Sequence, residues 1–211
     1  MRDAIHALKY GGLRPASQQL GRFLAHAIAQ LAHVAPGELL VVPVPLHGSK
    51  QTARGFNQAL LLAASALSFL RKSHPGWRLE LRPDILTRHR DTESQAGLTP
   101  RQRRLNLRGA FRLSDSAAVN GKHVLLIDDI FTTGATARAA AKALLNAGAE
   151  SVWVATLARA RMTNSRRFGF AAAYDAAKLA DEEVSTGSLL DSEPGPRLQP
   201  ASMYSQDQRS F

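Results

Sequence analysis

The stretch VLLIDDIFTTGAT, residues 124–136, decides the fold of this chain. It opens with an apolar run, continues with Asp128 and Asp129, and ends in a turn rich in threonine and glycine. Such a run predicts a buried strand, because strands of a parallel sheet covered on both faces are almost continuously hydrophobic. Residues 136–146 are rich in alanine and predict a helix that ends at Gly148. The stretch therefore predicts a strand, a turn and a helix.

The flanking segments extend this alternation. Residues 39–42 and 151–157 predict two more buried strands, and helical spacing of apolar residues predicts helices over 15–33 and 56–70. Further elements expected with less support are strands at 79–81 and 85–86, and a short helix at 99–105 with Thr99 as its N-cap. The order of strands and helices predicts an α/β fold with a mostly parallel sheet flanked by helices.

The length of 211 residues suits one domain with a tail. We expect an N-terminal helical segment at 1–35 and an α/β domain at 36–160. Residues 161–211 have a polar composition, with fading apolar periodicity, and predict a disordered C-terminal tail. The longest nearly apolar run, residues 59–70, is too short to span a bilayer, so we expect no membrane insertion and a cytoplasmic location.

Charge and cysteine content limit the classes of function. The net charge is +10, and residues 71–112 alone hold 11 basic and 4 acidic residues. Such a patch favours a polyanionic partner, although an arginine-rich solvated face gives the same count. The sequence contains no cysteine, which excludes disulfides, cysteine-based zinc sites and a thiol nucleophile within it.

The turn after the two aspartates has the features of a phosphate site. A loop that leads into a helix presents free backbone N–H groups and a partial positive charge. Carboxylates beside it would repel a phosphate, but they suit sugar hydroxyls or a Mg²⁺ ion that the ligand also binds. The pattern indicates a ribose 5-phosphate site, whereas an ordinary strand–turn–helix is the plainer alternative. It is not a P-loop, because no lysine follows the glycine.

The whole stretch resembles the phosphoribosyl pyrophosphate (PRPP) motif of type I phosphoribosyltransferases. Around it, VVPVPLH (41–47), RGFNQ (54–58) and LTRHRDTESQAGLTPRQRRLNLRGAF (86–111) occur in an order that resembles the ComF family, closest to its ComFC and GntX type. The family often carries an N-terminal four-cysteine zinc ribbon that this sequence does not include. The resemblance covers about residues 1–160 and implies a type I phosphoribosyltransferase-like fold.

The resemblance also implies roles for residues. Asp128 and Asp129 would be the catalytic pair, contacting the ribose hydroxyls directly or through water and Mg²⁺. The 5′-phosphate would be held by Thr132, Thr133, Gly134, Ala135 and Thr136. The pyrophosphate would face Pro43, Val44, Pro45, Arg54 and Asn57, with Gln58 nearby and a possible cis peptide bond at one of the prolines.

A mobile loop that closes over the site would supply Arg88, Arg90, Gln95, Arg101, Arg104 and Asn106. The alternative for each arginine is that it only solvates the loop. His47 and His89 are expected to be non-catalytic.

Two functions follow from the resemblance. The first is an enzyme that transfers a phosphoribosyl group from PRPP, with Mg²⁺, to an unknown acceptor and releases pyrophosphate. The second is a non-catalytic accessory protein of DNA transformation that binds PRPP, a nucleotide or single-stranded DNA, with competence-machinery proteins as possible partners. Neither the acceptor nor the oligomeric state follows from the sequence.

Overall fold

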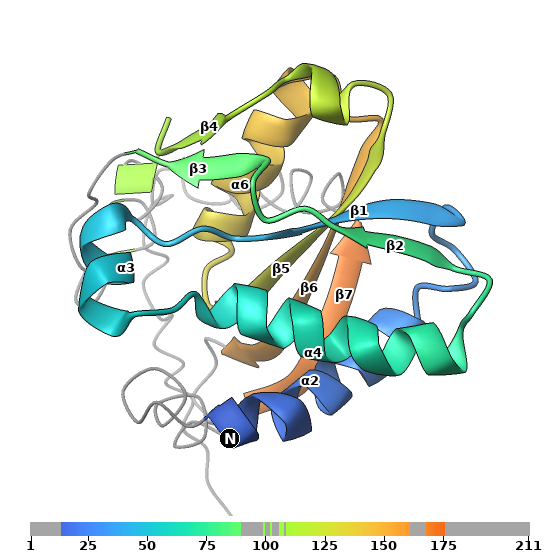
Figure 1. Ribbon diagram of the computed structural model, residues 1–211. Coiled ribbons are helices and arrows are strands. Elements are labelled where there is room, and N and C mark those ends of the chain that lie inside the picture. The colour runs from blue at the N-terminus through green and yellow to red at the C-terminus, as the bar shows by residue number, and fades with distance from the viewer. Residues whose placement is uncertain are drawn as a thin grey trace, which may run out of the picture.

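The computed structural model describes residues 14–89, 99, 102, 106, 107, 109–160 and 168–175. Its centre is a five-stranded sheet with the order β2-β1-β5-β6-β7 (Figure 1). The first four of these strands are parallel, and β7 runs antiparallel to β6. The strands are β1 (Glu38–Pro43), β2 (Arg78–Leu81), β5 (His123–Phe131), β6 (Ser151–Ala160) and β7 (Phe168–Asp175). The mostly parallel sheet predicted from the sequence is confirmed.

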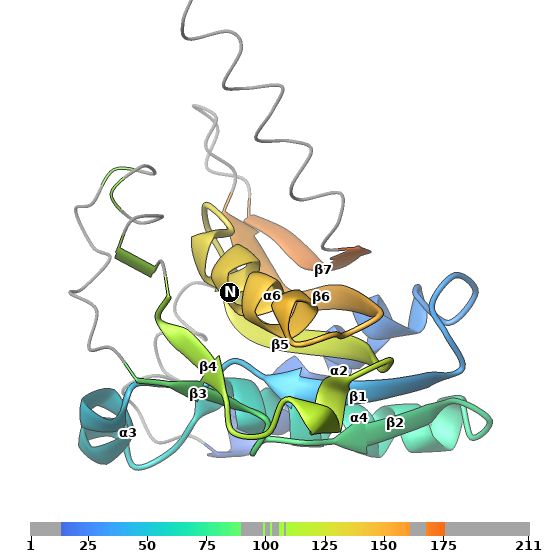
Figure 2. The same cartoon turned by 90° about the horizontal axis from the view of Figure 1, so that it is seen from above.

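Helices cover both faces of the sheet. The helices α2 (Arg14–Ala29) and α4 (Gln58–Ser73) lie on one face, and α6 (Ala135–Asn146) lies on the other (Figures 1 and 2). A small antiparallel pair, β3 (Leu86–Arg88) with β4 (Phe111–Leu113), packs on the same side as α6. The short helices α3 (Gly48–Arg54) and η1 (Ala117–Val119) complete the described elements.

Alternation along the central strands divides the core in two. Leu39 and Val41 pack with the apolar residues of α2 and α4, whereas Leu40 and Val42 pack with those of α6, β3 and β4. These side chains are 0–4% exposed, as expected for strands covered on both faces. Because α2 contributes Leu24 to the first of these cores, this helix belongs to the same domain as the sheet.

The structure differs from the expected C-terminal boundary. The segment 161–211 was expected to be a disordered tail, yet residues 168–175 within it form β7, paired with β6 from Trp153 to Ala160. The remainder of that expected tail lies outside the described residues. The α/β domain therefore does not end at residue 160.

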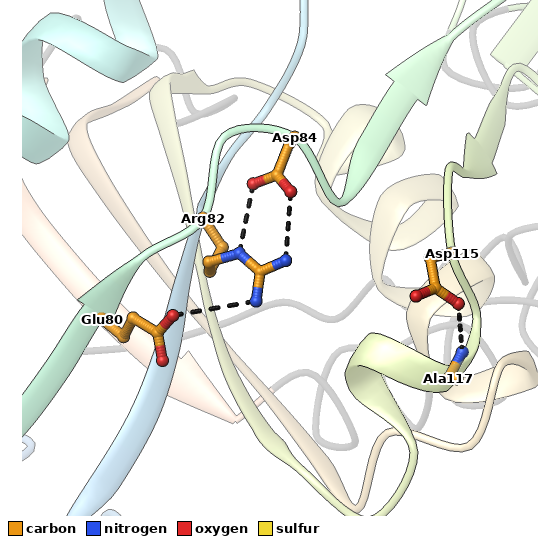
Figure 3. Close-up of polar contacts among 5 residues, drawn as sticks. All are labelled: Glu80, Arg82, Asp84, Asp115 and Ala117. Carbon is orange, nitrogen blue, oxygen red and sulfur yellow. Dashed lines mark hydrogen bonds and ion pairs between the residues drawn. The ribbon is translucent and has the colours of Figure 1, made fainter.

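The turn from β2 into β3 is braced by an arginine. Arg82 donates from Nε and Nη2 to the two carboxylate oxygens of Asp84, at 3.2 and 3.0 Å, and Nη1 lies 3.7 Å from Glu80 (Figure 3). The hydrogen bond from Arg82 lowers the pKa of the Asp84 carboxyl, and the same bond raises the pKa of Arg82. Part of the positive charge counted over residues 71–112 is thus neutralised locally.

Candidate functional site

The turn between β5 and α6 lies at the carboxyl edge of the parallel strands, where ligands of open α/β sheets bind. Asp128 and Asp129 lie in the C-terminal half of β5, and both side chains are half-buried. Gly134 precedes α6 in the left-handed conformation, with φ 72°. The predicted strand, turn and helix are all present, and they place the two carboxylates beside the N-terminus of a helix.

Asp128 accepts a hydrogen bond from the backbone N–H of Asp129 at its own Oδ1, at 2.8 Å. In the sheet, Asp128 is in register with Thr156 of β6. Thr156 is fully buried, and its Oγ1 has no hydrogen-bond partner among the described residues. Sequence reasoning did not single out this hydroxyl, since a threonine in a strand is ordinary.

The residues of the turn differ in how far they are exposed to solvent. Thr132 is exposed, Thr133 and Thr136 are half-buried, and Gly134 and Ala135 are buried. Thr133 Oγ1 lies 3.4 Å from the backbone N of Ala135, a long contact. A Cβ on Gly134 would clash with the ring of Phe131, so the backbone there packs closely on the end of β5. The turn is compact, and its outer side carries the hydroxyl of Thr132.

Arg138 is a residue of this turn that sequence reasoning missed. It lies one turn into α6, is half-buried, and donates from Nη2 to the backbone carbonyl of Thr133. Its Nη1 lies 3.0 Å from the position that a Cβ on Gly134 would take. The only available signal was an arginine four residues after the glycine, which in sequence looks like any exposed helix residue.

The loop after β1 lies directly beside the end of β5. Pro43 is in register with Ile127, and the backbone N–H of Val44 donates to the carbonyl of Ile127 at 2.8 Å. Val44 is buried at 5% exposure, so its side chain belongs to the core, and Pro45 is half-buried. The possible cis peptide bond at one of the prolines is not formed, because no cis bond occurs among the described residues, which include 43–47.

Asn57 has a structural role in this loop. Its Oδ1 accepts from the backbone N–H of Ala59 at 3.0 Å and caps α4, while its Nδ2 donates to the carbonyl of Val44 at 3.1 Å. Gln58, the first residue of α4, is buried at 2% exposure. Arg54 does not belong to this helix: it ends the preceding helix α3, and Gly55 follows in the left-handed conformation.

The predicted closing loop begins and ends at the β3–β4 pair. Arg88, in β3, holds its guanidinium carbon 5.7 Å from the ring centroid of Phe111 in β4, a cation–π contact. The backbone of Arg88 also forms a bridge with His47, so the loop after β1 meets the root of this segment. His47 caps α3 by accepting from Ser49 N–H at 3.3 Å.

Arg90, Gln95, Arg101 and Arg104 lie outside the described residues, and Asn106 is half-buried. The predicted N-cap is confirmed: Thr99 N–H donates to Gln102 Oε1 at 2.8 Å, and Gln102 N–H donates to Thr99 Oγ1 at 3.3 Å. This reciprocal pair is a capping box.

Among the described residues, no group of three histidine, cysteine, aspartate or glutamate side chains is arranged to hold a metal ion. No helix in that part of the chain combines the length and apolar character needed to cross a membrane.

The turn between β5 and α6 lies within a segment that matches a known protein family. Residues 59–168 match the family model described as the phosphoribosyl transferase domain. The chain belongs to the phosphoribosyltransferase family. The match begins in α4, spans the turn between β5 and α6, and ends at the first residue of β7. The fold is accordingly type I phosphoribosyltransferase-like, as the motif predicted.

Curated relatives narrow the resemblance. The chain is 35% identical over 157 residues to DNA utilization protein YhgH of Escherichia coli K12, covering 74% of this chain and 65% of that protein. It is 35% identical over 139 residues to Competence protein F of Haemophilus influenzae, covering 65% and 58%. It is 31% identical over 161 residues to Competence protein ComFC of Bacillus subtilis, covering 75% and 60%. The resemblance to the ComF family is confirmed.

Each match covers only part of this chain and part of the relative. The chain spans about 65% of the length of the YhgH relatives. Among solved structures, a hypoxanthine phosphoribosyltransferase from Staphylococcus aureus is similar with a TM-score of 0.41 and 21% identity, covering 72% of this chain and 67% of that one.

Proposed function

We propose that this chain binds PRPP, as its Mg²⁺ complex, at the turn between β5 and α6. The observation that carries the proposal is the placement of Asp128 and Asp129 beside the left-handed Gly134 and the N-terminus of α6, in a family member. Backbone amides at that terminus attract a phosphate, and the two carboxylates attract hydroxyls or a hydrated cation. A ribose 5-phosphate unit satisfies both requirements at once.

The parts of PRPP are assigned along the sheet edge. The 5′-phosphate would occupy the turn at 132–136, and the ribose hydroxyls would face Asp128 and Asp129. The pyrophosphate would face the loop at 43–47, which is hydrogen-bonded to the end of β5 through Val44. Val44 N–H is committed to that bond and Pro45 has none, so the amides available to an anion come later in the loop.

Mg²⁺ fits this donor set as an ion that arrives with the ligand. It prefers oxygen ligands, keeps several waters, and is usually held by one or two carboxylates together with substrate phosphates. The two aspartates supply that many carboxylates. When bound, the ion would neutralise charge on the pyrophosphate.

The proposed reaction is phosphoribosyl transfer. The bond between ribose C1 and the pyrophosphate oxygen breaks, a bond between C1 and the acceptor forms, and pyrophosphate leaves with the electron pair. The chain would contribute positioning of the ribose and positive charge near the leaving group, which are the two largest sources of catalysis for a displacement of this kind. The acceptor remains an unnamed nucleophile.

A second candidate function is a non-catalytic accessory role in DNA uptake or processing. The names of the relatives, a DNA utilization protein and two competence proteins, favour it. So does the excess of basic residues over 71–112. In this role PRPP or a nucleotide would be a bound ligand, and single-stranded DNA or a competence-machinery protein would be the partner.

Two measurements on the full chain separate these candidates. Isothermal titration with PRPP and Mg²⁺ tests the shared premise, and pyrophosphate release with a panel of bases tests turnover. Release above the uncatalysed rate supports the enzyme; binding without release under every acceptor supports the accessory role. Fluorescence anisotropy with labelled single-stranded DNA across a salt series tests that partner, because phosphate contacts make affinity fall steeply with salt.

A further inference from the structure

We propose that Arg138 is a positioning residue for the 5′-phosphate, which it serves by fixing the orientation of the peptide group between Thr133 and Gly134. This inference rests on the proposed function, because it concerns the same turn. It adds a residue that lies outside the motif itself and that the sequence pattern does not mark.

Two hydrogen bonds join Arg138 to the backbone of the turn, and the one from its side chain holds that peptide. Its guanidinium donates from Nη2 to the carbonyl of Thr133, and its backbone N–H donates to the carbonyl of Gly134 at 2.8 Å. Its Nη1 lies 3.0 Å from the place that a Cβ on Gly134 would take, so the guanidinium lies close against this part of the turn. The arginine side chain is therefore packed against the backbone of the turn.

The planarity of the peptide converts this contact into a direction for an amide. In a trans peptide, the carbonyl and the following N–H point in opposite directions. Because the carbonyl of Thr133 is held toward Arg138, the N–H of Gly134 is held away from it, on the outer side of the turn. That side is where the first amides of α6 have no partner within the helix. Arg138 thus adds one oriented donor to the set that would meet the phosphate.

The positive charge of Arg138 also favours a role in phosphate binding. A cation near a helix N-terminus opposes the helix dipole and is unfavourable by itself. A phosphate dianion bound at the turn reverses the sign of that interaction. An arginine held in the first turns of α6 therefore strengthens anion binding at a small cost to the unliganded helix.

The test compares two fragments of PRPP on the full chain. Ribose 5-phosphate has the ribose and the 5′-phosphate without the pyrophosphate. Pyrophosphate with Mg²⁺ represents only the leaving group. The variants are Arg138→Gln and Arg138→Lys, and the matched control is Lys142→Gln, which removes the same charge from an exposed position one turn later in α6. Far-UV circular dichroism and the thermal midpoint verify that each variant is folded.

We expect Arg138→Gln to weaken ribose 5-phosphate binding about tenfold or more, the scale of one hydrogen bond to a charged group, with pyrophosphate affinity unchanged. Arg138→Lys should recover part of the loss, and Lys142→Gln should change neither affinity. Unchanged binding of ribose 5-phosphate by a folded Arg138→Gln protein, or an equal loss of both ligands, would overturn the inference and leave the proposed function standing. A wild-type protein that binds neither ligand would overturn both.

Discussion

At the scale of single residues, the turn between β5 and α6 depends on Gly134 for two separate reasons. Its φ of 72° is a conformation that other residues adopt at a cost of about 1–2 kcal/mol. A Cβ there would also meet the ring of Phe131, which is buried at 5% exposure. The resemblance to the family places Gly134 among the residues that would hold the 5′-phosphate, and the structure adds its packing against Phe131.

Gly134→Ala should therefore destabilise the fold by about 3 kcal/mol, the sum of backbone strain and overpacking. The matched control is Gly121→Ala, at φ 64° with no atom within 4 Å of the added Cβ, which carries the strain alone and should cost about 1 kcal/mol. Urea unfolding followed by circular dichroism measures both. Equal losses in the two variants would show that Phe131 yields freely and that the turn is less rigid than its contacts indicate.

The same scale shows what the sequence can predict of the site. Asp128 and Asp129 directly follow the buried apolar run, as the motif predicts, although β5 continues beyond them to Phe131. Arg138 could not be predicted, since its contact depends on how the turn folds back on α6. Asn57 was assigned to the pyrophosphate because RGFNQ resembles the family pattern, and an asparagine at the start of a helix has the same sequence signal whether it caps the helix or binds a ligand.

At the scale of elements, the loop after β1 is tied to α4 through Asn57. One end of its amide caps the helix and the other holds the carbonyl of Val44. A single side chain thus fixes both the start of a core helix and the shape of the loop that would face the pyrophosphate. This hydrogen bond joins the segments VVPVPLH and RGFNQ, which are also close in sequence.

Asn57→Ala should lower the free energy of unfolding by about 2 kcal/mol, through loss of the cap and of the bond to Val44. Asn57→Asp keeps the capping acceptor and loses only the donor, so it should cost less. Chemical denaturation of both variants tests the assignment. If Asn57→Ala left stability unchanged but abolished PRPP binding, the side chain would be a ligand contact, as the sequence pattern first suggested.

At the scale of the whole molecule, the sheet forms a single unit from β2 to β7. The strand β7 was missed in the sequence because FGFAAAYD is rich in alanine, which is depleted in strands, and follows the polar residues 161–167. Its stability comes from pairing along β6 rather than from local propensity. The buried strands β1, β5 and β6 were predictable because short, nearly continuous apolar runs are typical of strands covered on both faces.

Ending the chain after residue 160 should destabilise the protein, because it exposes the edge of β6 and unpaired edges promote association. Ending it after Asp175 keeps all five strands and serves as the control. Thermal unfolding and size-exclusion chromatography of the two truncated proteins provide the comparison. Equal stability and the same elution volume would mean that β7 contributes nothing to the fold.

PRPP binding at the end of β5 is the central claim, and one titration tests it most directly. The variant carries Asp128→Asn together with Asp129→Asn, and the control is Asp115→Asn, the same chemical change at an exposed position where asparagine can still accept from Ala117 N–H. Isothermal titration with PRPP and Mg²⁺ should show binding to the wild type and to the control. It should show none to the folded double variant. Unchanged affinity in the double variant would contradict the assignment of this turn as the PRPP site.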